Sequence, residues 1–110
     1  MPDAAPENHI SRIPAENGLP AAAYVSPAWY DDERARVLRA GWLCLGRADE
    51  IPQPGDYAAR DLLGEPLVML RGEDDELRVF SRVCRHRGMD LISGEGNTRR
   101  FTCPYHAWTY

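Results

Sequence analysis

Two short segments near the end of the chain each place one cysteine close to one histidine. The first contains Cys84 and His86 in the run CRH, and the second contains Cys103 and His106 in the run CPYH, with sixteen residues between them. The chain has only three cysteines and three histidines, so two of each fall in these segments. Each segment follows a predicted strand and offers one thiolate and one imidazole from a tight loop. Mixed sulfur and nitrogen donors of this kind suit zinc or an iron–sulfur cluster.

The order of the donors separates these two kinds of site. Zinc sites of the Cys₂His₂ class pair cysteine with cysteine and histidine with histidine. Here each segment pairs a cysteine with a histidine, so each loop can reach both irons of a binuclear cluster. In a Rieske cluster two histidines replace two cysteines on one iron, which raises the reduction potential. The pattern favours such a cluster, with structural zinc or four residues of unrelated structural roles as the alternatives.

The whole pattern, C-x-H-x₁₆-C-x₂-H, resembles the signature of the Rieske-type non-haem iron ring-hydroxylating oxygenases, alpha subunit. The run WLCLGR at 42–47, followed by EIP at 50–52 and PGDY at 54–57, resembles the segment that leads into the first strands of that family's domain. The resemblance covers about residues 18–110. Ala107 departs from it, because many relatives carry glycine there.

The resemblance implies a cofactor and its ligands, a Rieske-type [2Fe–2S] cluster. Cys84 and Cys103 would bind one iron through their thiolates, and His86 and His106 would bind the other iron through a ring nitrogen. No residue of this chain is assigned a catalytic role. Cys44 alternates with apolar neighbours and is predicted to be a buried small hydrophobe.

Neighbours of the four donors are expected to support the cluster. Gly88 lets backbone N–H groups approach the sulfur atoms closely. Tyr105 is predicted to donate its hydroxyl near a cluster sulfur or thiolate. Trp108 is predicted to pack beneath the loops.

The predicted fold class is mainly β, an N-terminal helix followed by a small antiparallel Rieske-type β-domain. Residues 1–25 read as an extended arm or as disordered chain. Residues 26–41 read as a helix, with Ser26 as the cap and Pro27 at the first helical position. Residues 42–110 read as the Rieske domain, incomplete at its C-terminal end. The predicted strands are 42–47, 56–63, 66–71, 77–82 and 99–103, with a polar Gly-led hairpin loop at 72–76 and turn residues at 93–98.

The resemblance also implies a role and partners. The domain would pass electrons from a ferredoxin or flavin reductase to a mononuclear Fe(II), in an aromatic ring-hydroxylating or demethylating mono- or dioxygenase that is a homotrimer or α₃β₃ assembly. The catalytic domain and the pocket for a small organic substrate would lie outside this chain, so the chain alone is expected to be inactive and Tyr110 is not expected to be the natural end. The alternative is a stand-alone Rieske ferredoxin that only carries electrons.

Composition excludes several other classes of protein. A net charge of −4 argues against a nucleic-acid binder, and no apolar run approaches the roughly 18 residues of a membrane span. Three cysteines are too few for a disulfide scaffold, which favours a cytoplasmic protein. Charge is uneven, because residues 77–110 hold six arginines against two acidic residues. This balance of +4 predicts either solvated faces or a basic rim that meets an acidic partner.

Overall fold

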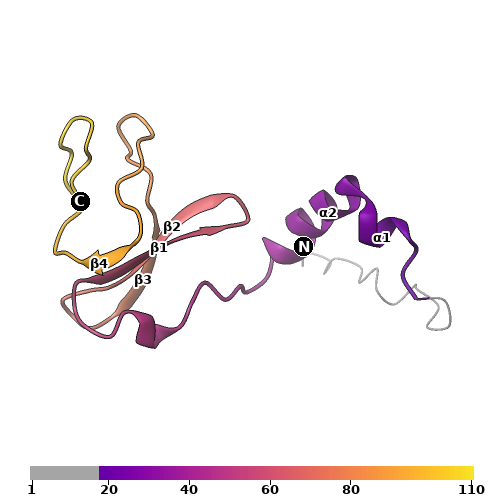
Figure 1. Ribbon diagram of the computed structural model, residues 1–110, viewed down its shortest axis with the longest axis horizontal. Helices are drawn as coiled ribbons and strands as arrows, with labels where there is room; N and C mark the ends of the chain where they lie inside the picture. The colour runs from indigo at the N-terminus through magenta and orange to yellow at the C-terminus, as the bar shows by residue number, and fades with distance from the viewer. Residues whose placement is uncertain (1–17) are drawn as a thin grey trace, which may run out of the picture. The chain divides into compact units, whose positions relative to one another are not determined.

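The computed structural model describes residues 18–110 (Figure 1). Most of the predicted N-terminal arm, residues 1–17, lies outside the described part of the chain. The chain divides into two compact units, Met1–Trp42 and Leu43–Tyr110. None of the helices within residues 18–110 has both the length and the apolar character needed to cross a bilayer.

The described part of the first unit is helical. Helix α2 spans Pro27–Glu33 and continues into a wider turn, η2, over Arg34–Leu38. Ser26 caps α2 as predicted, because its Oγ accepts a hydrogen bond from the backbone N–H of Trp29 at 3.3 Å. A short helix, α1, spans Ala22–Val25, where extended or disordered chain was predicted. Its alanines favour helix, and a single turn is too short to leave a periodic pattern in the sequence.

The second unit is built on a four-stranded antiparallel sheet, which confirms the mainly β fold class. Strand β1 spans Asp56–Leu62, β2 spans Glu65–Arg71, β3 spans Leu77–Ser81 and β4 spans Glu95–Asn97. The spatial order is β3-β2-β1-β4, so β3 and β4 are the two edge strands. Each edge strand leads into one of the segments that carry a cysteine and a histidine.

Local turn chemistry sets the register of the first three strands. Leu62 pairs with Glu65 across a two-residue turn, and both turn residues, Leu63 and Gly64, have positive φ angles of 53° and 82°. This is the backbone that a tight hairpin with a matching twist requires. The predicted hairpin loop at 72–76 is confirmed, because the Gly72 N–H donates to the Glu76 carbonyl at 2.9 Å.

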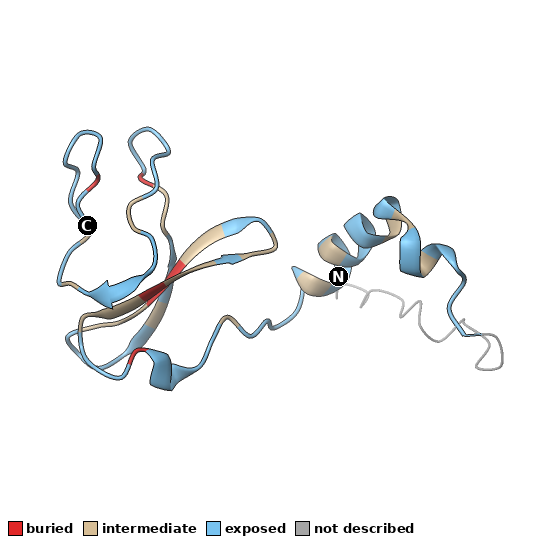
Figure 2. Cartoon of the chain, in the orientation of Figure 1, coloured by how far each residue is buried: buried red, intermediate tan, exposed pale blue. Residues whose placement is uncertain are grey.

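A small core lies under this sheet. Ile51, Ala58 and Met69 are buried together, and the partly buried Leu45 packs against them. The other buried residues are Val68 in β2 and one cysteine in each of the two donor segments (Figure 2). The sheet is therefore a platform, and the donor segments extend from its two edges (Figure 1).

Two strand predictions are wrong. Residues 95–97, expected to be turn, form β4 by pairing with β1, whereas residues 99–103 form only an isolated bridge at Thr102. Residues 42–47, expected to be a strand, are extended but join no strand of the described residues, and Cys44 is exposed rather than buried. An apolar alternating run becomes a strand only when a neighbour supplies its ladder hydrogen bonds.

Candidate metal centre

The two donor segments fold into loops with the same backbone hydrogen bonds. In the first loop, residues 83–90, the Cys84 N–H donates to the Met89 carbonyl at 2.7 Å, and the Gly88 N–H donates to the Cys84 carbonyl at 3.0 Å. In the second loop, residues 102–109, Cys103 bonds Trp108 and Ala107 bonds Cys103 in the same pattern, at 2.7 and 2.9 Å. The sequence does not reveal that the two loops share this backbone, because the histidine stands two residues after the first cysteine and three after the second.

Each loop needs one residue in the left-handed backbone region, and both place it four residues after the cysteine. Gly88 has φ +74°, and Ala107 has φ +60°. Glycine adopts this conformation freely, whereas an alanine Cβ meets the following carbonyl oxygen. The departure from glycine at Ala107 therefore falls at the one position of the second loop where a side chain carries a conformational cost.

The loops sort the four candidate donors by burial. Cys84 and Cys103 are 2% and 3% exposed at the bases of the two loops. His86 and His106 are exposed at the tips, and their ring centroids lie 4.9 Å apart with the planes at 68°. The structure thus brings the two imidazoles together at the loop tips and the two thiols, whose side chains interact, together at the loop bases.

A tyrosine hydroxyl joins the second loop to the first cysteine. The Tyr110 hydroxyl lies 3.3 Å from the Cys84 sulfur and accepts the backbone N–H of Arg85 at 3.0 Å. Because a lone pair of the Tyr110 oxygen accepts the Arg85 N–H, the hydrogen of the hydroxyl is free to point at the Cys84 sulfur. This hydrogen bond lowers the pKa of the Cys84 thiol, and the N–H groups of His86 and Arg87 lower it further. The same contact raises the pKa of Tyr110. Stabilising the thiolate prepares the form of cysteine that binds metal.

Two further aromatic side chains flank the imidazoles. The indole of Trp108 stacks on the His86 ring with centroids 4.7 Å apart and planes within 5°. The ring of Tyr105 lies against His106, with centroids 3.8 Å apart and a 35° tilt. The prediction that Trp108 packs beneath the loops is wrong, because Trp108 is 49% exposed beside His86. The role of the Tyr105 hydroxyl stays a prediction, and the tyrosine hydroxyl that lies at Cys84 is that of Tyr110.

Each loop is held at its base. Arg82, directly after β3, donates from its guanidinium to the Arg60 carbonyl at 3.0 Å and pairs with Asp61 at 3.0 Å and Asp90 at 3.5 Å. The second loop is closed by two hydrogen bonds of 2.9 Å between the backbones of Phe101 and Tyr110. The thiols and imidazoles therefore sit on braced hairpins rather than on free chain.

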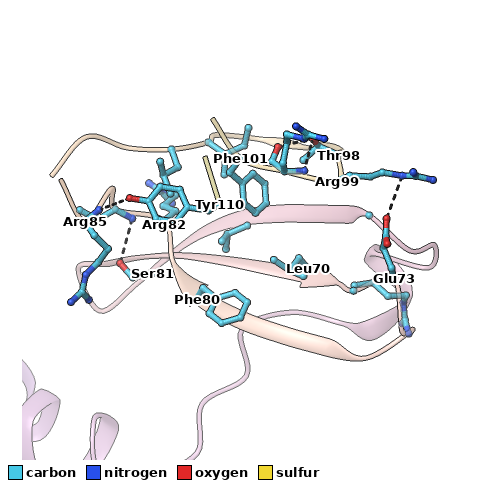
Figure 3. Close-up of a pocket in the computed structure, with 18 residues that line it drawn as sticks. Leu70, Glu73, Phe80, Ser81, Arg82, Arg85, Thr98, Arg99, Phe101 and Tyr110 are labelled. Carbon is cyan, nitrogen blue, oxygen red and sulfur yellow. Dashed lines mark hydrogen bonds and ion pairs between the residues drawn. The ribbon is translucent and has the colours of Figure 1, made fainter. Parts of the chain in front are cut away.

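A groove of about 540 Å³ lies between the sheet and the bases of the loops (Figure 3). Its lining is mostly apolar and includes Leu70, Phe80 and Phe101. None of the four candidate donors lines it. Tyr110 and Arg85, which are joined by a hydrogen bond, line this groove and adjoin the candidate centre.

The donor set fits a binuclear cluster. Within residues 18–110 no group of three or more cysteine, histidine or acidic side chains is arranged to hold a metal ion. The donors form instead a pair of buried thiols, whose side chains interact, and a pair of neighbouring imidazoles. A [2Fe–2S] cluster takes two protein donors on each iron, and its Rieske form takes two cysteines on one iron and two histidines on the other.

Comparison with known proteins identifies the family of this domain. Residues 41–110 match the family model described as "Rieske [2Fe-2S] domain". The chain is 38% identical over 106 residues to the carnitine monooxygenase oxygenase subunit of Acinetobacter baumannii, covering 96% of this chain and 29% of that protein. It is 38% identical over 107 residues to the biphenyl dioxygenase subunit alpha of Metapseudomonas furukawaii, covering 96% of this chain and 23% of that protein.

Solved structures show the same fold. A quaternary ammonium Rieske monooxygenase in complex with its substrate gamma-butyrobetaine superposes with a TM-score of 0.79 and 41% sequence identity, covering 84% of this chain and 27% of that chain. This chain therefore spans less than a third of the length of the relatives it matches.

Proposed function

This chain belongs to the family of Rieske [2Fe–2S] domains, and from that membership we propose that it is the electron-carrying domain of a Rieske non-haem iron oxygenase alpha subunit. We propose that Cys84 and Cys103 bind one iron of the cluster and that His86 and His106 bind the other. The observation that carries this proposal is the pair of equivalent loops, which gather two buried thiols and two exposed imidazoles. When bound, a [2Fe–2S] cluster accepts and donates one electron at a time.

Different residues of the chain would contribute in different ways to binding the cluster. Both cysteines are buried, so water has little access to their sulfur atoms. The Tyr110 hydroxyl stabilises the Cys84 thiolate. The imidazoles stand at the loop tips, which makes the histidine side the face open to electron-transfer partners. In the full-length oxygenase these would be a ferredoxin or flavin reductase as donor and a mononuclear Fe(II) as acceptor. The two relatives described above are named as a monooxygenase oxygenase subunit and a dioxygenase subunit alpha, which favours this role over a stand-alone ferredoxin.

Basic side chains without an ion-pair partner support the proposal that the protein that delivers electrons is acidic. Arg78, Arg82 and Arg99 are held by acidic residues of this chain. Arg85 and Arg87, on either side of His86, form no ion pair with any described residue. Their free guanidinium groups beside a candidate ligand would attract an acidic surface and make electron delivery sensitive to salt.

Assembly, substrate and location are proposed for the full-length protein. It would form a homotrimer or an α₃β₃ complex and act on a small organic substrate bound outside this domain, as a mono- or dioxygenase. A cytoplasmic location fits three cysteines that are all free, because the cytoplasm keeps thiols reduced.

Single substitutions of every cysteine and histidine test the proposed ligands. Cys84→Ser, Cys103→Ser, His86→Ala and His106→Ala are expected to lose the two irons and two acid-labile sulfides of the wild-type protein. Cys44→Ser and His9→Ala are the matched controls, since they remove the remaining cysteine and the remaining histidine, and both are expected to keep the full content. One zinc ion without labile sulfide in the wild-type protein would overturn the proposal.

A further inference from the structure

Four rings of the two loops form a connected series, in which each imidazole contacts the other imidazole and one further aromatic ring. His106 lies against Tyr105, the residue next to it in the same loop. His86 has no such neighbour in its own loop, because arginines stand on both sides of it. The aromatic ring that covers His86 comes from Trp108, in the other loop.

An exposed histidine on a loop needs an external contact to hold its ring. The torsion that turns an imidazole about its Cβ–Cγ bond is broad, so the ring nitrogens of a free His86 side chain would sweep through a range of directions. A metal ligand must present its lone pair in one direction, and the residues around metal-binding histidines supply that orientation. His86 makes no side-chain hydrogen bond within the described residues that could do so.

The backbone that carries the Trp108 ring is held in place. The Trp108 carbonyl accepts the Cys103 N–H at 2.7 Å, and the left-handed turn at Ala107 directs the chain into this bond. The indole plane then lies within 5° of the His86 imidazole plane at a centroid distance of 4.7 Å, a parallel stacking contact. An aromatic side chain carried by the second loop thereby lies parallel to an imidazole of the first loop.

We infer that Trp108 is a positioning residue that orients the His86 imidazole for cluster binding by stacking on it from the opposite loop. This inference rests on the proposed function, because orientation matters only if His86 is a ligand. It assigns to the second loop two roles, since that loop supplies its own two donors and also aligns a donor of the first loop.

The test compares Trp108→Leu, which removes the ring, with Trp108→Phe, which keeps a flat aromatic ring. Trp42→Leu is the matched control, because Trp42 is fully exposed and stacks on no described ring. The variants are made in the complete polypeptide that carries this sequence. In the cluster-free protein, the ring protons of His86, assigned with His86→Gln, are expected to be shifted upfield by the stacked indole in NMR spectra. Trp108→Leu is expected to abolish that shift.

In the cluster-loaded protein, pulsed EPR of the reduced cluster reports the nitrogen couplings of the two imidazoles separately. Trp108→Leu is expected to alter or broaden one coupling and leave the other unchanged, and to speed loss of iron to a chelator roughly two- to tenfold, the factor that corresponds to one aromatic stack. Trp108→Phe and Trp42→Leu are expected to behave as the wild type.

The possible results separate the inference from the proposed function. If Trp108→Leu changes neither the nitrogen couplings nor the rate of iron loss, the inference is overturned. The proposed function still stands in that case, provided that the protein holds two irons and two sulfides per chain. Equal damage in Trp108→Phe and Trp108→Leu would also overturn the inference, because bulk rather than the ring plane would then be the cause. A wild-type protein that binds no cluster would overturn both.

Discussion

Replacing Arg82 with methionine tests how firmly the first loop is fixed to the sheet. The Arg82 side chain is only 11% exposed. One terminal nitrogen donates to the Arg60 carbonyl at 3.0 Å and points at the Leu67 carbonyl at 3.5 Å. The other pairs with the carboxylates of Asp61 and Asp90 at 3.0 and 3.5 Å. The substitution removes all of these contacts and keeps an apolar side chain of similar length.

The expected loss follows from the geometry of each contact. A hydrogen bond from a charged donor to the Arg60 carbonyl contributes about 1.5–3 kcal/mol, whereas the contact at 3.5 Å to Leu67 is at the limit for a bond. The two carboxylates are 71% and 56% exposed, so each ion pair adds about 0–1 kcal/mol. The buried Nε of Arg82 has no partner among the described residues, and removing it returns about 1 kcal/mol. The free energy of unfolding is expected to fall by about 1–3 kcal/mol.

Urea denaturation of the two proteins measures this difference, provided that the slope of the transition is unchanged. Arg78→Met is the matched control. Arg78 makes a forked pair with Asp74 at 2.7 and 2.6 Å, but the two side chains are 40% and 54% exposed. Its loss is therefore expected to be smaller than that of Arg82→Met. Equal losses in the two variants, or a change below about 0.5 kcal/mol for Arg82→Met, would refute the reasoning.

Three further predictions concern the second loop and the surface charges. Ala107→Gly is expected to raise the free energy of unfolding by about 0.5–1 kcal/mol, because alanine is held at φ +60°; a loss in urea denaturation would contradict the strain. Tyr110→Phe is expected to raise the pKa of the Cys84 thiol, since the donating hydroxyl is gone; thiolate absorbance in the cluster-free protein would then appear at higher pH, and an unchanged titration would count against this contact. The Arg78 guanidinium holds the pKa of Asp74 far below its ordinary value. The pair therefore stabilises the fold above about pH 3.9, and the contribution declines as pH falls below that value toward the folded-state pKa. The advantage of the wild type over Asp74→Asn should accordingly shrink in acid unfolding curves, and an advantage independent of pH would exclude the pair as its source.

Local sequence features predicted the parts of the fold that depend on neighbouring residues. The first three strands lie within one residue of their predicted bounds, because alternation and the Gly-led loop at 72–76 are read from consecutive residues. The Ser26 cap is a contact between residues three apart. The four candidate donors were also selected from the sequence, since the chemistry of their side chains and their spacing in tight loops are local properties.

The wrong predictions depend on contacts between distant residues. Residues 95–97 become β4 because β1 offers them a free edge, and residues 42–47 remain extended without a ladder because no described strand pairs with them. Strand pairing is a property of two segments, so alternation in one of them is not sufficient.

The environment of the candidate centre was likewise decided by the tertiary structure. Tyr110 and Trp108 reach Cys84 and His86 across 26 residues and 22 residues of chain. No pattern within either segment predicts these contacts, because they arise only when two loops of equal backbone geometry rise from opposite edges of one sheet. The order of the amino acids alone specifies which atoms are available as donors. The order of the strands in the sheet brings the two loops together. Their contact places a hydroxyl beside a thiol and an indole on an imidazole. Side chains far apart in a chain become neighbours only through the packing of the elements that carry them.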